Sequence, residues 1–230
     1  MRLFPVVEMF GPTIQGEGPF AGRNAVFLRL GGCNLACSWC DTPYSWDGER
    51  FNLRKEITNY SVPEIMERMP HGGSCVITGG EPLLHQVNAW WRNLLYELRM
   101  RYGTLHLETN GTIEPITATI DLCDHISVSP KLPNAGRHRG HQRPDIWPGW
   151  VDIQDAILKF VVEDEADVEI AVLRAAGLGF SRDRVWVMPQ GITKDELDKR
   201  WPIIAESAAR HGIHATHRLQ VLAWDAERGH

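Results

Sequence analysis

Short apolar runs rich in Val, Ile and Leu alternate along the chain with longer stretches whose apolar residues recur at helical spacing. Runs of this kind predict strands, and their alternation with helices predicts a parallel sheet. The predicted strands are residues 25–30, 75–78, 105–109, 125–129, 156–162 and 185–188.

The helices between these strands have recognisable ends. A hydroxyl residue followed three positions later by Glu predicts helix starts at Ser61 and Thr193. The Trp- and Leu-rich stretch 86–102 predicts one long helix that packs into the core. Glycine favours the left-handed conformation that ends a helix, and the glycines at predicted ends are Gly103, Gly177 and Gly212.

Polar or glycine-rich segments follow the predicted strands at their carboxyl ends. In a βα barrel, closed or partial, the loops after the strands meet at one face, so we expect these segments to form a single site. They are Cys33, Thr-Gly-Gly-Glu-Pro at 78–82, Glu-Thr-Asn-Gly at 108–111, Ser-Pro-Lys at 129–131 and Met-Pro-Gln-Gly at 188–191. The Pro- and Gly-rich stretch 132–150 is the one long irregular segment, which we interpret as a surface excursion or a mobile cover. The last apolar run, 219–224, is expected to close a sheet edge or contact another subunit.

Composition restricts the function classes. Hydrophobic residues make up 43% of the chain and charged residues 23%, which excludes a disordered protein. We predict a single domain over residues 1–230, with a frayed tail at 226–230. The net charge of -5 and the scattered Arg residues do not favour nucleic-acid binding, and no apolar stretch or leader pattern predicts a membrane span or secretion. We therefore expect a cytoplasmic protein that acts on a small molecule.

Three of the five cysteines fall within eight residues, as Cys33, Cys37 and Cys40 in the spacing CxxxCxxC. Three thiolates leave one iron of a 4Fe-4S cubane open to a non-protein ligand. A structural zinc site is the alternative, but it takes four protein ligands, and the nearest His, His71, is far along the chain. Cys75, like Cys123, lies by an apolar run and is interpreted as a small buried hydrophobe.

The cysteine spacing, an aromatic residue before the last Cys, and the strand end 78–82 together resemble the radical S-adenosylmethionine superfamily. This resemblance implies a partial (β/α)6 TIM-like barrel, in which the open iron binds the methionine moiety of S-adenosylmethionine. Reductive cleavage of that cofactor then supplies a 5′-deoxyadenosyl radical. The residues implied to bind S-adenosylmethionine are Trp39, Cys40, Asp41, Gly80, Glu108, Ser129, Pro130 and Lys131.

The segment Gln15-Gly16-Glu17-Gly18, the strand residue Arg29 and the sequence Cys-Asp-Thr at 40–42 are similar to the 7-carboxy-7-deazaguanine synthase family. The resemblance implies a carbon–nitrogen lyase of 7-deazapurine, queuosine-type biosynthesis. It would convert 6-carboxy-5,6,7,8-tetrahydropterin to 7-carboxy-7-deazaguanine and ammonia by radical ring contraction.

The same resemblance implies that Thr42 helps to bind Mg²⁺, which also contacts the substrate carboxylate. The chemistry of Arg29 suits a carboxylate, although a strand arginine paired with a nearby acid is the plainer interpretation. Glu17 can accept hydrogen bonds from the pterin amino and ring N–H groups. The residues implied to contact the substrate are Ile14, Gln15, Gly16, Glu17, Arg29, Thr78 and Gln190.

Other classes remain open from the sequence. A glycyl-radical activase would share the cysteines but not the Gln-Gly-Glu-Gly segment, and an iron–sulfur electron carrier would supply four protein ligands. The expected partners are a reductant protein, such as a flavodoxin or ferredoxin, and a second copy of the chain in a homodimer. The downstream 7-deazapurine pathway is not indicated by any residue pattern.

Overall fold

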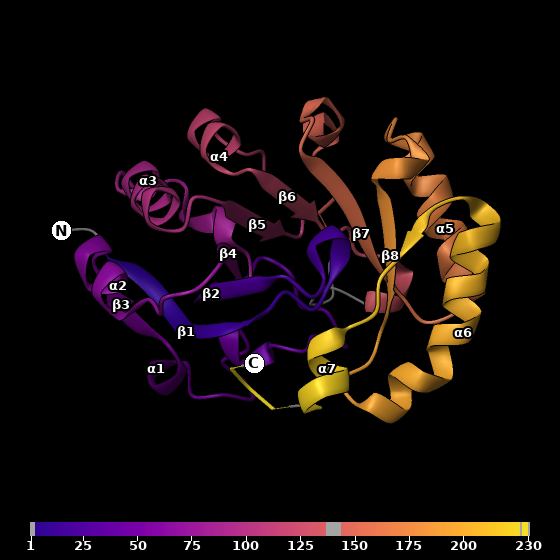
Figure 1. Ribbon diagram of the computed structural model, residues 1–230, viewed down its shortest axis with the longest axis horizontal. Helices are drawn as coiled ribbons and strands as arrows, with labels where there is room; N and C mark the ends of the chain where they lie inside the picture. Colours follow the sequence, from indigo (N-terminus) through magenta and orange to yellow (C-terminus); the bar gives the residue numbers. More distant parts are fainter. Residues whose placement is uncertain (1–2, 137–143, 226, 230) are drawn as a thin grey trace.

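The computed structural model describes residues 3–136, 144–225 and 227–229 and places nine strands in one sheet, in the order β3-β1-β2-β4-β5-β6-β7-β8-β9. All six predicted strands are present, and each pairs with its neighbour in parallel. They are β2 (Asn24–Leu30), β4 (Ser74–Gly79), β5 (Leu105–Thr109), β6 (His125–Val128), β7 (Ala156–Val162) and β8 (Val185–Pro189). This open, mostly parallel sheet with flanking helices confirms the predicted partial barrel (Figure 1).

Three further strands were not predicted. The strand β1 (Phe4–Ile14) pairs antiparallel with β2, and β3 (Thr58–Tyr60) pairs antiparallel with β1. The third, β9 (His214–Ala215), extends the parallel part beyond β8. They complete the two edges of the sheet.

Side chains of the parallel strands alternate between two faces, as the pleat requires. One face is apolar and buried: Leu28, Ile77, Leu107 and Leu158 belong to the main hydrophobic core, which also includes residues of the helices. The opposite face carries polar residues, among them Arg29, Thr78, Glu108, Ser127 and Lys159. Strand pairing sets Arg29 directly beside Thr78 and Glu108 directly beside Ser127.

The helices α3 (Trp91–Tyr102), α4 (Thr117–Leu122) and α5 (Glu165–Gly177) lie along the outer side of the curved sheet (Figure 1). The others are α1 (Leu53–Glu56), α2 (Val62–Arg68), α6 (Lys194–His211) and α7 (Leu219–Trp224). Among the described residues, no helix is both long and apolar enough to cross a membrane.

Most predicted helix ends are confirmed. Ser61 and Thr193 each form a capping box, and Gly103 and Gly212 are the C-terminal caps of α3 and α6. Helix α5 ends at Gly177 as predicted, but the left-handed conformation expected of that glycine was wrong: the C-cap is Leu178, and Gly179 has the positive φ, 82°.

The predicted start of the long helix at residue 86 was also wrong, because α3 begins at Trp91. The Gln86 side chain instead donates to the Glu114 carbonyl at 2.6 Å and accepts from the Ile116 N–H at 3.0 Å. The segment before α3 is therefore held by tertiary hydrogen bonds in a non-helical path.

Candidate active site

The cysteine loop follows β2 at the carboxyl end of the sheet. Cys33, Cys37 and Cys40 form one small cluster with the buried side chains of Leu35 and Ala135, and all three line one cavity. Two backbone hydrogen bonds hold the loop: Gly32 N–H donates to the Ser45 carbonyl at 2.7 Å and Ser38 N–H to the Ala135 carbonyl at 3.1 Å. The three thiols therefore lie close together in the fold.

The chemistry of these thiols suits an iron–sulfur cluster. No group of three His, Cys, Asp or Glu in the described parts of the chain converges on a single ion. A cubane does not need such convergence, since each thiolate binds its own iron. Burial raises the pKa of Cys33 to about 12, so at neutral pH iron must displace a proton from it. Cys75 and Cys123 are buried in the main core, away from this loop.

The end of β4 packs directly against the cysteine loop. A Cβ at Gly80 would lie 2.2 Å from the Gly32 carbonyl oxygen and 2.9 Å from Cys33 Cβ, so no side chain fits there. The family resemblance implies that Gly80 contacts S-adenosylmethionine. In the structure, the close contact between the two loops by itself requires glycine at this position.

Glu81, in the same strand end, is fully buried. Its carboxylate accepts hydrogen bonds from the Leu83 N–H at 2.9 Å, the Thr109 hydroxyl at 2.8 Å and the Asn110 N–H at 2.7 Å. Burial raises the pKa of Glu81 despite these donors. The residue ties the end of β4 to the end of β5, a role that the sequence did not reveal.

Two cavities meet at the cysteine loop. The first is lined by the cysteines and by predicted cofactor contacts, which are Trp39, Asp41, Gly80, Glu108, Ser129 and Lys131, together with Gln190. Pro130 is buried in the chain between Ser129 and Lys131. Lys131 Nζ donates to Ser129 Oγ at 2.8 Å and lies 5.5 Å from the centre of the Trp39 ring.

The second cavity is lined by the predicted substrate contacts Ile14, Gln15, Gly16, Glu17, Arg29 and Thr78. Both cavities share Cys40, Asp41, Thr42, Thr78, Glu108 and Glu17. A ligand in one cavity would therefore touch the walls of the other.

Arg29 is paired with an acid of β1. Its Nε lies 2.8 Å from Glu8 Oε2, and the Tyr44 hydroxyl donates to the same oxygen at 3.3 Å. Arg29 is thus a strand arginine paired with a nearby acid, as the plainer interpretation of the sequence predicted. Since a guanidinium has five N–H donors, the group still has donors to offer a ligand in the second cavity.

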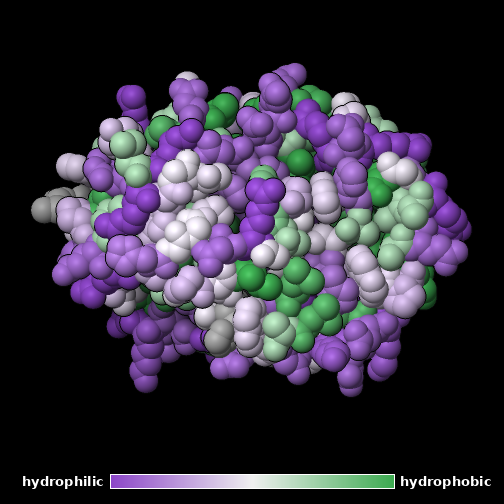
Figure 2. All heavy atoms as spheres, in the orientation of Figure 1, coloured by the Kyte–Doolittle hydropathy of each residue, from purple (hydrophilic) through white to green (hydrophobic). Residues whose placement is uncertain are grey.

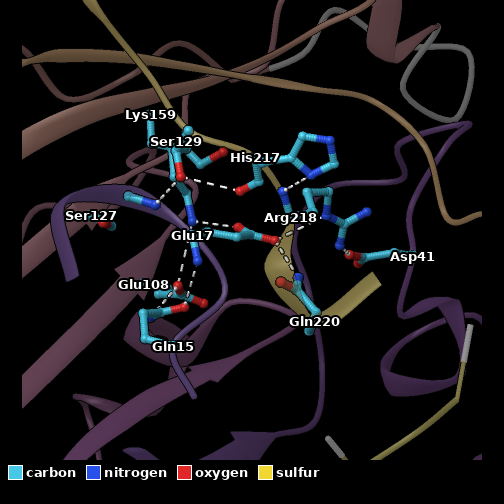
Figure 3. Close-up of polar contacts among 12 residues, drawn as sticks. Gln15, Glu17, Asp41, Glu108, Ser127, Ser129, Lys159, His217, Arg218 and Gln220 are labelled. Carbon is cyan, nitrogen blue, oxygen red and sulfur yellow. Dashed lines mark hydrogen bonds and ion pairs between the residues drawn. The ribbon is translucent and has the colours of Figure 1, made fainter. Parts of the chain in front are cut away.

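A buried charge network lies between the cavities (Figure 3). Lys159, in the middle of β7, lies 2.6 Å from Glu17 Oε2 and 3.4 Å from Glu108 Oε1. Arg218 Nε lies 3.0 Å from Glu17 Oε1, and Gln220 Nε2 donates to that oxygen at 2.7 Å.

The network fixes the charge of its members. Burial alone would raise the pKa of Glu17, but the charges of Lys159 and Arg218 outweigh burial and hold it well below its ordinary value. Burial would lower the pKa of Lys159, yet Glu108 and Glu17 raise it. Glu17 is therefore a carboxylate, and Lys159 a cation, throughout the neutral range.

Arg218 also reaches two other loops. Its guanidinium donates to the Asp41 carboxylate and to the Gly191 carbonyl. The neighbouring helix α7 is attached to the N-terminal segment, because Leu219 N–H donates to the Gly16 carbonyl at 3.0 Å. The last apolar run thus helps to wall the second cavity, which was not expected.

The sequence therefore missed Lys159, Arg218 and Gln220. A signal existed for Lys159, because it is the single charged residue in an otherwise apolar strand, Ala-Ile-Leu-Lys-Phe-Val-Val. Such a residue needs a partner when it is buried. Arg218 and Gln220 had no such signal.

Comparison with known proteins identifies the family. Residues 28–159 match the radical SAM superfamily. A 7-carboxy-7-deazaguanine synthase from Pyrobaculum aerophilum is 38% identical, over 97% of this chain and 96% of that protein. The chain belongs to the 7-carboxy-7-deazaguanine synthase family. The enzymes of that name from Hyperthermus butylicus and Halobacterium salinarum are 35% and 36% identical over 94% and 96% of this chain, and 91% and 90% of theirs.

The fold agrees with this assignment. The crystal structure of QueE from Escherichia coli superimposes with a TM-score of 0.66 at 24% identity, and 94% of each chain is covered. Family membership confirms a radical SAM lyase of deazapurine biosynthesis, with a 4Fe-4S cluster and S-adenosylmethionine as cofactors. The alternatives of a glycyl-radical activase, an electron carrier and a zinc module are thereby set aside.

Proposed function

We propose that this radical SAM enzyme converts 6-carboxy-5,6,7,8-tetrahydropterin to 7-carboxy-7-deazaguanine and ammonia. The observation that carries the proposal is the junction of the two cavities. Predicted cofactor contacts line the first cavity, predicted substrate contacts line the second, and Cys40, Asp41, Thr42 and Thr78 belong to both. A substrate in the second cavity would therefore lie next to a cofactor in the first, as a reaction between them requires.

On the cofactor side, Cys33, Cys37 and Cys40 hold the cluster. Trp39 to Asp41, Gly80, Glu108 and the segment 129–131 bind S-adenosylmethionine. Lys131, held by Ser129 at 2.8 Å, carries the positive charge that suits the cofactor carboxylate. When bound, the cluster and S-adenosylmethionine together supply a carbon-centred radical that removes a hydrogen atom from the substrate.

On the substrate side, Arg29 binds the carboxylate through the N–H groups that do not contact Glu8. Glu17 accepts from the amino and ring N–H groups of the pterin, since its charge is maintained by Lys159 and Arg218. The side chains of Gln15 and Thr78, and that of Gln190 from the first cavity, supply neutral donors and acceptors to the remaining polar edge. The backbone of Ile14 and Gly16 completes this wall.

Thr42 is proposed to bind Mg²⁺ together with substrate oxygens and water. Magnesium often keeps several waters and takes few protein ligands, so one hydroxyl is sufficient. Thr42 lines both cavities, where an ion would touch the substrate carboxylate. The adjacent Asp41 carboxylate lines the same two cavities and is paired with Arg218.

We further propose a cytoplasmic homodimer that receives electrons from a flavodoxin- or ferredoxin-like protein. A partial barrel leaves apolar surface uncovered: Ile192 and Leu222 are exposed, and Figure 2 shows apolar side chains gathered over α7. Light scattering of the reconstituted enzyme tests the dimer, with a monomer as the contrary result. The net charge of -5 gives no support for a nucleic-acid partner.

The test is anaerobic reconstitution with iron and sulfide, followed by reductant, S-adenosylmethionine, Mg²⁺ and the tetrahydropterin. Mass spectrometry should detect 7-carboxy-7-deazaguanine with the wild type and with Cys123→Ala, a buried cysteine outside the loop. Cys37→Ala should give none. Cofactor cleavage without this product, over a range of substrate concentrations, would be consistent with a radical SAM enzyme but would refute the proposed substrate.

A further inference from the structure

Cys40 has an aromatic N–H donor beside its sulfur. The indole Nε1 of Trp46 lies 3.3 Å from Cys40 Sγ. An indole nitrogen is a donor only, so the direction of this hydrogen bond is fixed by chemistry. We propose that Trp46 tunes the iron–sulfur cluster by donating this hydrogen bond to the Cys40 thiolate and raising the cluster's reduction potential.

The backbone holds Trp46 in this place. It follows the short 3-10 turn Pro43–Ser45, and its own N–H donates to the Pro43 carbonyl at 3.1 Å. The Ser45 carbonyl of the same turn accepts from Gly32 N–H at 2.7 Å, which is where the cysteine loop begins. The indole is therefore anchored to the loop that carries the ligands, and it lines the first cavity.

Three other donor groups near these sulfurs lie farther away. Leu35 N–H lies 3.4 Å from Cys33 Sγ, and Asn110 Nδ2 lies 4.0 Å from it. The Thr42 hydroxyl lies 3.8 Å from Cys40 Sγ and is proposed to bind Mg²⁺ instead. Trp46 thus supplies the shortest side-chain contact of this kind among the interactions found in the described parts of the chain.

Trp39 provides a natural comparison. It stands beside Cys40 in the chain, but its Nε1 is buried without a hydrogen-bond partner in the described part of the protein. Both indoles therefore lie near Cys40, and in the described part of the chain the N–H of Trp46, not that of Trp39, donates to its sulfur. Replacing either with Phe removes one N–H and retains an aromatic ring.

Hydrogen bonds to cluster sulfurs disperse the extra negative charge of the reduced state, and they are one of the factors that set reduction potentials. Losing one such bond makes the cluster harder to reduce. Because the effect acts through Cys40, Trp46 is a positioning residue and touches no reacting atom. This inference rests on the proposed ligation by the cysteines and not on the identity of the substrate.

The experiment is a redox titration of the reconstituted cluster, followed by electron paramagnetic resonance without S-adenosylmethionine. Trp46→Phe should shift the midpoint potential to more negative values than the wild type, at equal iron content. Trp39→Phe should leave the potential unchanged. In protein labelled with ¹⁵N at the indoles, the reduced wild-type cluster should show a ¹⁵N coupling that Trp46→Phe loses and Trp39→Phe retains.

A loaded Trp46→Phe cluster with the wild-type potential and coupling would overturn the inference while leaving the cysteine assignment intact. A wild type that takes up no cluster would overturn both. If Trp46→Phe does not fold, the labelled Trp39→Phe protein still decides the matter, because absence of any ¹⁵N coupling there refutes the hydrogen bond. Product analysis plays no part in these outcomes, so the proposed substrate is tested separately.

Discussion

Lys159→Met removes the central cation of the buried network with little change in side-chain length. The Lys159 side chain is 5% exposed and lies 2.6 Å from Glu17, which is itself 11% exposed. Breaking a buried ion pair by removing one partner costs about 3–5 kcal/mol, because the remaining charge is left uncompensated. Arg218 and Gln220 still contact Glu17, so we expect the lower end, about 3 kcal/mol.

The loss is measured by anaerobic urea unfolding of the apo protein. Lys159→Met also removes the cation beside Glu108, 3.4 Å away, but that carboxylate is 25% exposed and can be solvated by water. Substrate binding should weaken as well, since loss of Lys159 raises the pKa of Glu17 and makes it a poorer acceptor. We expect KM for the pterin to rise, and to rise further as the pH is lowered.

A double-mutant cycle provides the control. The double variant Lys159→Met/Glu17→Gln has a neutral amide at position 17, which does not require the cation of Lys159. It should therefore lose less stability than the sum of the two single variants. Lys55→Met, on the surface helix α1, should unfold like the wild type. A Lys159→Met protein within about 1 kcal/mol of the wild type, with an unchanged KM, would refute the role given to the network.

Three further outcomes are expected. Gly80→Ala should lower the iron content after reconstitution, because its Cβ would meet Cys33; wild-type iron content would contradict this. Glu81→Gln should destabilise the protein by about 1–3 kcal/mol in urea unfolding, because an amide cannot accept all the donors around Glu81, including the Asn110 N–H. Glu17 has a lowered folded pKa, so its contribution to stability is present above the unfolded value of about 4.3 and is lost as pH falls through the folded value. Acid titration of stability should therefore be shallower in Glu17→Gln, and identical curves would count against the network.

The parallel part of the fold was predictable because its strands are short runs rich in Val, Ile and Leu that alternate with helical stretches. The strand β1 escaped prediction for the opposite reason. It contains Pro5, Gly11 and Pro12 and has two register shifts against β2, features that locally resemble turns. The strands β3 and β9 have three and two residues, too few to show a period.

The site residues also divide into those that the sequence predicted and those that it did not. The three cluster cysteines were found because they lie close together in the chain. The strand-end residues were found because parallel strands bring their carboxyl ends to one place. Arg218 and Gln220 were not found, because their partner Glu17 is 201 and 203 positions away. Trp46 is six residues from Cys40, but its contact depends on how the 3-10 turn directs the indole.

The most direct test of the central claim uses tetrahydropterin carrying deuterium at C6. If the two cavities bring this carbon to the cofactor, the label should be recovered in S-adenosylmethionine after turnover, while the product carbon that bears the carboxylate carries no hydrogen and so retains none. Product formed while the cofactor acquires no deuterium would contradict the account of the site, and unlabelled cofactor with no product would contradict the proposed reaction itself.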